Sequence, residues 1–216
     1  MEIIRFADIR PEPWRNGGGV TRELARHPAA ASAQGGSAQD GSTQDGSWDW
    51  RVSIAEVSKA GEFSTFPGME RVITIIDGEL LLLTVDGSEH PLEKYRPFRF
   101  SGDATSASSL PTGDVRDLNV IARTGAFKGY TSIVEISKKR AHPVFEGQLA
   151  VLLEGKATVA PGTLGGNTPD GGAAPTSADE PLELSRYDTV VGSDTRSPEI
   201  SGRGFIAVIS IDPVDA

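Results

Sequence analysis

The sequence predicts an all-β protein made of two stacked jelly-roll-like modules with little helix. Three observations carry this prediction: short segments that alternate apolar and polar residues, Asp-Gly pairs that separate such segments, and an internal repeat of one β unit. An apolar period of 3.6 residues, which would indicate a helix, is found only weakly, over residues 20–26.

The strand pattern is clearest over residues 50–55, where large apolar residues alternate with small or polar ones. Residues 71–76 and 79–85 are also of strand type, and Asp77-Gly78 separates them, while Asp86-Gly87 ends the second. Asp-Gly supplies the positive φ angles of tight hairpin turns, so this region predicts a β-meander. Further strands are expected at residues 118–122, 130–136, 149–153 and 205–211.

An internal repeat predicts the two modules. Residues 75–79 (IIDGE) are echoed by residues 152–156 (LLEGK), and a Pro-Leu-Glu motif with a later arginine and glycine recurs with the same spacing. The later residues are Arg96 and Gly102 in the first copy and Arg186 and Gly192 in the second. Chance similarity among hairpins is the alternative, but agreement in both type and spacing favours a double cupin, with modules at residues 1–140 and 141–216.

Two segments differ from the rest of the chain in composition. Residues 29–47 and 160–179 are rich in Gly, Ala, Ser and Asp, and they contain almost no large apolar residues. Such segments bury too little apolar surface to offset the entropy of ordering. We therefore interpret both as flexible insertions within the modules, because strand-like sequence resumes after each.

Composition excludes several classes of function. No cysteine is present, which removes disulfides, thiolate metal sites and cysteine nucleophiles and suits a reducing cytoplasm. The net charge is -9, and the longest basic run is Lys138-Lys139-Arg140, so nucleic acid is a poor candidate partner. The N-terminal residues lack the pattern of a signal peptide, and no stretch is apolar enough to span a membrane, so we expect a cytoplasmic protein.

The histidine pattern predicts no metal and no cofactor. Metal-bearing cupins present a His-x-His pair, a Glu and a later His, but residues 63–70, the corresponding stretch here, contain no histidine. His27, His90 and His142 are isolated and lack paired spacing. A transition-metal site needs several converging ligands.

A glycine-rich segment over residues 14–23 (WRNGGGVTRE) permits two interpretations. Its exposed N–H groups would form a small anion nest, helped by Arg15 or Arg22. Alternatively, the glycines let the N-terminal segment cross the module closely, with Asn16 or Thr21 capping the turn. The spacing fits neither a P-loop nor a dinucleotide fingerprint.

The sequence resembles the HutD/Ves family. The resemblance rests on four blocks in the family's order: residues 14–23, residues 50–55, the pattern G-x-F-S-x-F-P-G-x-x-R over 61–71, and residues 116–120 (RDLNV). It implies a bicupin fold without the metal histidines. It also implies a link to bacterial histidine utilisation, where a HutD protein is thought to limit the pathway, with N-formylglutamate proposed as its ligand. The two insertions depart from the compact family pattern.

In light of this resemblance, we place a ligand pocket where the four blocks meet, in the first module. Arg51 and Ser53 share one face of a strand, opposite the face of Trp50. An arginine binds a carboxylate by bidentate, charge-assisted hydrogen bonds, although a structural ion pair is the alternative for any single arginine. The candidate ligand-binding residues are Asn16, Thr21, Glu23, Arg51, Ser53, Ser64, Arg71 and Asn119.

Three functional hypotheses follow. The first is a metal-free protein that binds a small anionic metabolite, resembling N-formylglutamate, and modulates histidine utilisation without catalysis. The second is a metal-independent isomerase or hydrolase that acts on a small carboxylate, with Glu23 as general base beside Arg51. The third is an interaction protein without a cavity. Homodimerisation through a sheet edge is a further expectation.

Overall fold

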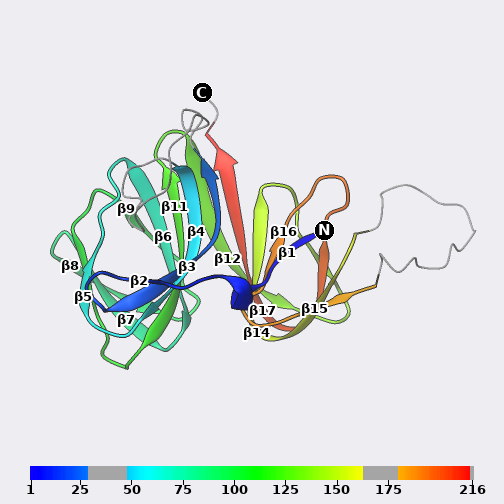
Figure 1. The fold of residues 1–216 in the computed structure, drawn as a ribbon, viewed down its shortest axis with the longest axis horizontal. Coiled ribbons are helices and arrows are strands. Elements are labelled where there is room, and N and C mark those ends of the chain that lie inside the picture. Colours follow the sequence, from blue (N-terminus) through cyan, green and yellow to red (C-terminus); the bar gives the residue numbers. More distant parts are fainter. Residues whose placement is uncertain (29–47, 163–179, 215–216) are drawn as a thin grey trace, which may run out of the picture. The chain divides into compact units, whose positions relative to one another are not determined.

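The computed structural model describes residues 1–28, 48–162 and 180–214, and these residues form an all-β protein (Figure 1). The described part contains no α-helix and one short 3-10 helix, η1 (Phe6–Asp8). None of its helices is long and apolar enough to cross a membrane. The strands are β1 (Glu2–Ile4), β2 (Glu12–Pro13), β3 (Gly19–Pro28), β4 (Trp48–Val57), β5 (Gly61–Phe63), β6 (Met69–Asp77), β7 (Leu80–Val85), β8 (Ser88–Glu93), β9 (Phe98–Ser101), β10 (Ser106–Ser109), β11 (Val115–Arg123), β12 (Phe127–Ile136), β13 (His142–Pro143), β14 (Gln148–Ala160), β15 (Leu182–Leu184), β16 (Thr189–Val191) and β17 (Glu199–Pro213).

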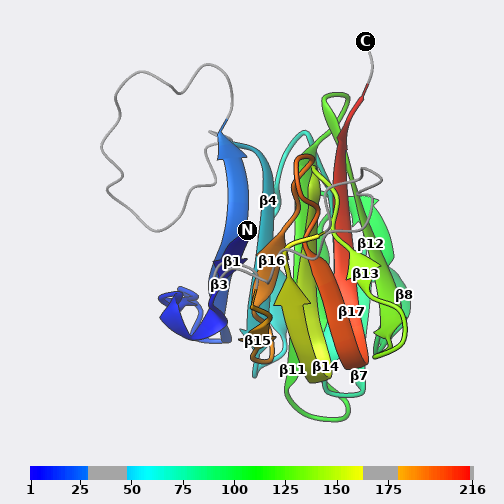
Figure 2. The same ribbon diagram turned by 90° about the vertical axis from the view of Figure 1, so that its right-hand side faces the viewer.

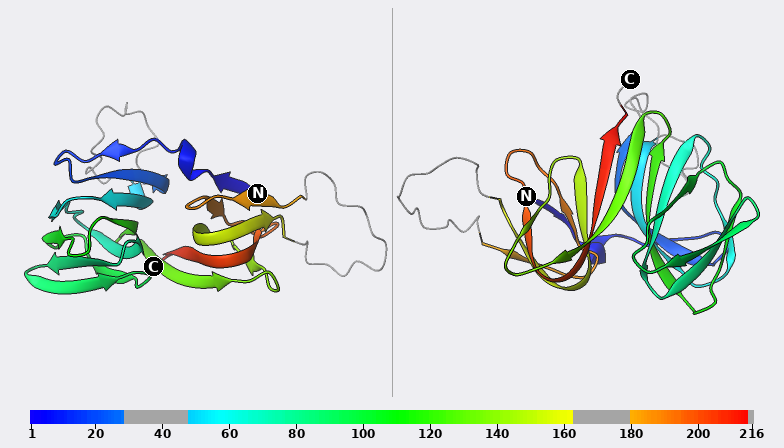
Figure 3. Two further views of the ribbon diagram at one scale, coloured as in Figure 1. Left: turned by 90° about the horizontal axis from the view of Figure 1, so that it is seen from below. Right: turned by 180° about the vertical axis from the view of Figure 1, so that it is seen from behind.

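Contacts divide the chain into two compact units. One contains residues 9–131 and 211–216, and the other contains residues 1–8 and 132–210. The sequence-based division at residue 140 places the N-terminal residues with the first module. In the structure, however, β1 pairs with β16, so that Glu2 lies opposite Val191 (Figure 3). The chain therefore starts in the unit that holds most of its second half.

In the unit of residues 9–131, a six-stranded sheet faces a four-stranded sheet. The larger sheet has the order β2-β3-β4-β11-β6-β9, and the smaller one has the order β5-β10-β7-β8 (Figure 1). Ile73 and Ile75 of the first sheet and Leu81 and Leu83 of the second are fully buried in one apolar cluster. Period-two alternation supplies this packing, because it directs one set of side chains from each strand into the interior.

Strand β3 explains the weak helical period over residues 20–26. Its pairing with β4 shifts between Glu23 and Ala25, so Leu24 is the additional residue of a β-bulge. The bulge interrupts the alternation of faces along β3. The apolar residues of β3 are therefore spaced almost as they would be in a helix, although the segment is an extended strand.

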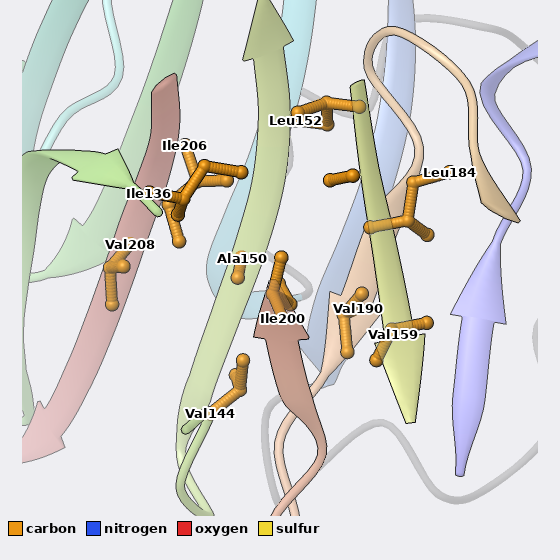
Figure 4. Packing of buried hydrophobic residues seen from close by; sticks show 11 residues of the cluster. Ile136, Val144, Ala150, Leu152, Val159, Leu184, Val190, Ile200, Ile206 and Val208 are labelled. Carbon is orange, nitrogen blue, oxygen red and sulfur yellow. The ribbon is translucent and has the colours of Figure 1, made fainter. Parts of the chain in front are cut away.

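The other unit is built on a seven-stranded sheet with the order β1-β16-β14-β17-β12, to which β13 and β15 also pair (Figure 2). Buried apolar side chains form one cluster in the interior of this unit (Figure 4). Ala150, Leu152, Val159, Ile200 and Ile206 are all unexposed in this cluster. Side chains thus fill the interior of this unit.

The glycines that the internal repeat pairs, Gly102 and Gly192, make the same kind of backbone hydrogen bond in the two units. In one, Gly102 N donates to Met69 O at 2.8 Å; in the other, Gly192 N donates to Gln148 O at 2.9 Å. Neither Gly102 nor Gly192 can carry a side chain, because an added Cβ would lie 2.4 Å and 1.7 Å, respectively, from a backbone oxygen. Counted from these two hydrogen-bonded residues, Arg71 follows Met69 by two positions, and Ala150 follows Gln148 by two positions.

The two insertions predicted from composition lie almost entirely outside the described residues. This holds for residues 29–47 and for residues 163–179. The first residues of the second segment are described: Ala160 ends β14, and Gly162 O accepts a hydrogen bond from Arg196 Nε at 3.0 Å. The first residue of the predicted insertion, Ala160, therefore still belongs to β14.

Candidate functional site

A polar cavity of about 310 Å³ lies in the unit of residues 9–131. Its floor consists of inward-facing residues of β4, β6 and β11, and its edge is formed by the glycine-rich segment and the residues around β5. The cavity is lined by Glu12, Pro13, Trp14, Arg15, Asn16, Thr21, Arg51, Ser53, Ala55, Glu62, Phe63, Ser64, Phe66, Arg71, Asp117, Asn119 and Ile121.

Strand register arranges the cavity floor in three rows. In the first row, Arg51 and Arg71 stand on either side of Ile121. They are two strand spacings apart, roughly 10 Å between Cα atoms. In the second row, Ser53 stands beside Asn119, and in the third, Ala55 stands beside Asp117. The two cationic side chains therefore start from one end of the floor and the acidic one from the other.

Arg71 is held rigidly beneath the cavity. It is 5% exposed, and its Nη2 donates to Asn119 Oδ1 at 3.0 Å while its Nη1 donates to Ser64 O at 3.3 Å. Its Cζ atom lies 4.9 Å from the ring centroid of Phe100 and 5.2 Å from that of Phe66. Its Nε is buried without a hydrogen-bond partner in the described structure. Burial lowers the pKa of Arg71 to about 10, although Asp117 opposes this, so the side chain stays cationic at neutral pH.

Arg51 is held by aromatic rings. Its Cζ atom lies 5.2 Å from the ring centroid of Trp48 and 5.5 Å from that of Phe66. Its Nε is likewise buried and has no hydrogen-bond partner among the residues described. Burial lowers the pKa of Arg51, and the carboxylate of Glu23 acts in the opposite direction. A planar donor group held against two rings, with an unused N–H, is ready to bind an oxyanion.

Asp117 completes the polar floor. It is 1% exposed, and its Oδ1 accepts a hydrogen bond from Asn119 Nδ2, whereas its Oδ2 has no partner in the part of the chain that is described. Burial raises the pKa of Asp117 to about 7, although Arg71 and the hydrogen bond from Asn119 act against the rise. The cavity thus contains a carboxyl group that changes its charge near neutral pH.

The glycine-rich segment forms the turn between β2 and β3. Gly17 N donates to Trp14 O at 3.0 Å and Gly18 N donates to Asn16 Oδ1 at 2.9 Å, so these two N–H groups are used within the turn. Gly19 lies so close to Glu56 O that a Cβ would be 2.3 Å away. The segment is therefore a close-packed crossover, and these bonds contradict the anion-nest interpretation.

All candidate residues except Glu23 line the cavity. At its edge, Asn16 Oδ1 caps the turn, and Thr21 Oγ1 accepts a hydrogen bond from Trp14 Nε1 at 2.8 Å. Ser53 lines the floor at 2% exposure, and Ser64 contributes the carbonyl that holds Arg71. These four side chains add hydroxyl and amide groups around the arginines.

Glu23 does not line the cavity. Its Oε1 lies 3.4 Å from Arg26 Nε, in an ion pair between two partly exposed side chains. The expectation that Glu23 serves as a ligand or a general base in the cavity is therefore not supported by its position. Glu23 lies directly opposite Ser53 in the β3–β4 ladder, but its carboxylate pairs with Arg26 instead.

Sequence reasoning missed Asp117 and the aromatic supports. A signal for Asp117 was available, because period-two alternation places Asp117 on the same face as Asn119, which was selected. No comparable signal exists for Trp48. It follows a compositionally biased segment, and only the fold brings its ring to Arg51.

The lining residues do not fit a transition metal. Two guanidinium groups repel a cation, and Asp117 is the one carboxylate on the described floor rows. Within residues 1–28, 48–162 and 180–214, no group of three or more His, Asp or Glu side chains is placed to hold a metal ion. The donor set suits an anion instead.

Comparisons with known proteins identify the family. The HutD family model matches residues 6–208. Protein Ves of Citrobacter koseri is 37% identical over 61% of this chain and 64% of its own length. An uncharacterized 21.2 kDa protein in the hutC 3′ region of Pseudomonas putida is 37% identical over 56% of this chain and 57% of its own length. The matched parts thus span less than two thirds of these relatives.

Solved structures show the same fold over nearly the whole chain. HutD from Pseudomonas fluorescens SBW25, in a formate condition, has a TM-score of 0.69 at 26% identity over 99% of both chains. A conserved protein of unknown function from Pseudomonas aeruginosa PAO1 has a TM-score of 0.72 at 22% identity, also over 99% of both chains. A cupin 2 conserved barrel domain protein from Leptotrichia buccalis has a TM-score of 0.57 at 8% identity, over 98% of this chain and 96% of its own. Since the family model covers almost all of this cupin-like chain, the chain belongs to the HutD family.

Proposed function

We propose that this protein binds a small carboxylate in the cavity above Arg51 and Arg71 and senses it without chemical conversion. The observation that supports this most directly is the pair of buried guanidinium groups, each with an Nε that lacks a hydrogen-bond partner in the described structure. A carboxylate between them would satisfy donors whose burial is otherwise unfavourable. A volume of about 310 Å³ is at the small end of the range for ligand pockets, which suits a metabolite.

The proposed ligand is an acidic intermediate of histidine degradation that resembles N-formylglutamate, and the proposed role is modulation of histidine utilisation in the cytoplasm. Membership of the HutD family and the relative in the hutC 3′ region support this assignment. The absence of cysteine from the chain suits a reducing compartment. The formate condition of the Pseudomonas fluorescens structure suggests formate as the simplest carboxylate probe.

Calorimetry and thermal unfolding test the proposal. N-formyl-L-glutamate, L-glutamate, urocanate, L-histidine and formate are each titrated into the full chain. A ligand that binds only the native state stabilises it by about 2.7 kcal/mol at 100 times its Kd, so N-formyl-L-glutamate should raise the melting temperature. No response to any of the five at millimolar concentration contradicts the proposal.

Two matched variants test whether the ligand binds in this cavity. Arg51→Met should weaken binding at least tenfold, because it removes a charge-assisted donor from the cavity. Arg99→Met is the control, since Arg99 pairs with Glu70 and does not line the cavity. Equal losses of affinity in both variants would indicate that binding occurs elsewhere.

A second candidate function is metal-independent acid–base chemistry on a small carboxylate. It is favoured by one observation: a cavity-lining carboxyl, Asp117, whose pKa burial raises to about 7 beside Arg71. Exchange of a proton next to the ligand's carboxylate in deuterated water, followed by NMR, tests it. Exchange that Asp117→Asn abolishes supports catalysis, and exchange at the rate without protein contradicts it.

A further inference from the structure

Asp117 leaves one carboxyl oxygen without a partner inside the cavity. The residue is 1% exposed, and its Oδ1 is occupied by Asn119 Nδ2. Its Oδ2 is buried and accepts no hydrogen bond within the described residues. An unsatisfied buried acceptor costs free energy comparable to a lost hydrogen bond, and more when it is charged. A hydrogen-bond donor in the cavity would remove this cost.

The polar groups nearest to Asp117 in the network are already hydrogen-bonded to other partners. Asn119 accepts from Arg71 through Oδ1 and donates to Asp117 Oδ1 through Nδ2. Arg71 uses Nη1 and Nη2 on Ser64 O and Asn119. The residues directly beside Asp117 in the sheet are Ala55 and Ile75, which have no polar side-chain atoms. Because Asp117 lines the cavity, a ligand there is placed to supply the donor that Oδ2 lacks.

We propose, resting on the carboxylate-binding function above, that Asp117 determines specificity by accepting a hydrogen bond from an N–H group of the ligand. The cavity would then select carboxylates that carry an acylated or free amine and discriminate against nitrogen-free carboxylates. Arg51 and Arg71 bind the anionic end of such a ligand, and Asp117 binds its nitrogen. The complementary charges on the cavity floor orient the ligand in one direction.

The charge of the site agrees with this assignment. The floor carries two cationic side chains and one carboxyl group. An N–H donor stabilises the ionised form of Asp117, whose pKa is raised mainly by burial. A nitrogen-free dicarboxylate would instead place its second carboxylate near Asp117, where repulsion opposes binding.

A ligand pair that differs in one group tests the inference. N-acetyl-L-glutamate and (S)-2-acetoxyglutarate have nearly the same shape, but the second has an ester oxygen in place of the N–H. Calorimetry on the wild-type chain should give about 10- to 100-fold weaker binding for the ester, because it loses a hydrogen bond to a charged group and brings a lone pair toward Asp117.

Two variants assign the preference to one residue. In Asp117→Asn the preference for the amide should fall to within about threefold, because a carboxamide can accept from N–H or donate to an ester oxygen. Asp86→Asn is the matched control: Asp86 is exposed, and its carboxylate caps Thr105 N at 2.9 Å. It should retain the full preference.

The outcomes separate this inference from the proposed function. Equal affinity of wild type for both ligands overturns the role of Asp117 and leaves carboxylate binding intact. Tighter binding of the ester, increasing as pH falls from 8 to 6, also overturns it, because Asp117 would then act as a hydrogen-bond donor. Absence of binding for both ligands and for N-formyl-L-glutamate contradicts the proposed function itself. The wild-type comparison holds even if Asp117→Asn does not fold.

Discussion

Arg71 Nη2 donates to Asn119 Oδ1 at 3.0 Å and joins β6 to β11 through a buried side-chain bond in addition to the backbone ladder. Asn119 Nδ2 in turn donates a hydrogen bond to Asp117 Oδ1. A cation, an amide and a carboxyl group thus form one buried network beneath the cavity. Such networks respond strongly to the removal of one member, because the remaining members keep their desolvation penalty.

The first prediction concerns stability and contrasts the two arginines. Arg71→Met should lower the free energy of unfolding by about 3 kcal/mol at pH 7, because it leaves Asn119 Oδ1 unsatisfied and Asp117 without its cation. Arg51→Met should change it by less than about 1 kcal/mol, because the methionine side chain can pack against the rings of Trp48 and Phe66 as the arginine does. Urea unfolding measures both, and equal losses would contradict this account.

The second prediction concerns pH. Folding raises the pKa of Asp117 from an ordinary value of 3.8 to about 7, so the folded protein holds this proton more tightly than the unfolded chain does. This contribution to stability is therefore complete below about pH 4, declines as pH rises, and is lost above about pH 7. Between pH 5 and pH 8, the titration of Asp117 should lower the free energy of unfolding by about 2.6 kcal/mol, at 1.36 kcal/mol per pH unit up to about pH 7.

The variant Asp117→Asn isolates the pH-dependent contribution of Asp117 to the free energy of unfolding, because the carboxamide remains neutral at all these pH values. The unfolding free energy of wild type minus that of the variant should fall by about 2.6 kcal/mol between pH 5 and pH 8. Urea unfolding at both pH values measures it. Parallel pH profiles for the two proteins would show that Asp117 titrates normally.

The third prediction concerns the repeated turn. Gly192→Ala should destabilise the protein by about 3 kcal/mol or more, because the new Cβ would lie 1.7 Å from Phe145 O and the backbone must shift. Gly113→Ala serves as the control: Gly113 has a φ of 100° but nothing within 4 Å of the added atom, so the cost is about 1 kcal/mol of backbone strain. Thermal unfolding compares them, and a smaller effect at Gly192 would contradict the close approach.

The fourth prediction concerns the N-terminal segment. Asp188 is 2% exposed; its Oδ1 accepts from Phe6 N at 3.0 Å, and its Oδ2 accepts from Arg5 Nη1 at 2.6 Å and Ser185 N at 2.9 Å. Asp188→Asn retains one acceptor oxygen and should cost about 2 kcal/mol. Hydrogen exchange at the Phe6 amide should become at least tenfold faster, while exchange in β11 stays unchanged. Unaltered exchange at Phe6 would contradict the tethering role.

Much of the fold followed from local pattern. The alternation over residues 50–55 predicted β4 and the face that carries Arg51 and Ser53, and the Asp77-Gly78 pair predicted the end of β6. These features depend on neighbours in the chain. By contrast, the pairing of β1 with β16 joins distant parts of the chain and has no local signal, which is why the predicted division at residue 140 differs from the contact-based units.

The candidate site was predictable to the extent that strand faces determine it. Asn119 and Arg71 were identified as separate candidates, but their hydrogen bond depends on the register of two strands far apart in sequence. The burial that raises the pKa of Asp117 is likewise a property of the packed sandwich. Glu23 illustrates the opposite error: the register places it beside Ser53, but its carboxylate pairs with Arg26, and nothing in the sequence indicates which partner the side chain takes.

Ala150 stands in the second copy where the first copy carries Arg71, and aliphatic neighbours close the space around it (Figure 4). A doubled architecture would suggest two equivalent receptors per polypeptide, yet the duplicate lacks the guanidinium that an anion needs. Saturation should accordingly occur at one molar equivalent along a simple hyperbola, with a Hill coefficient of about 1 for a single independent site. The apolar interior of the second unit therefore predicts that only the first unit takes up the proposed ligand.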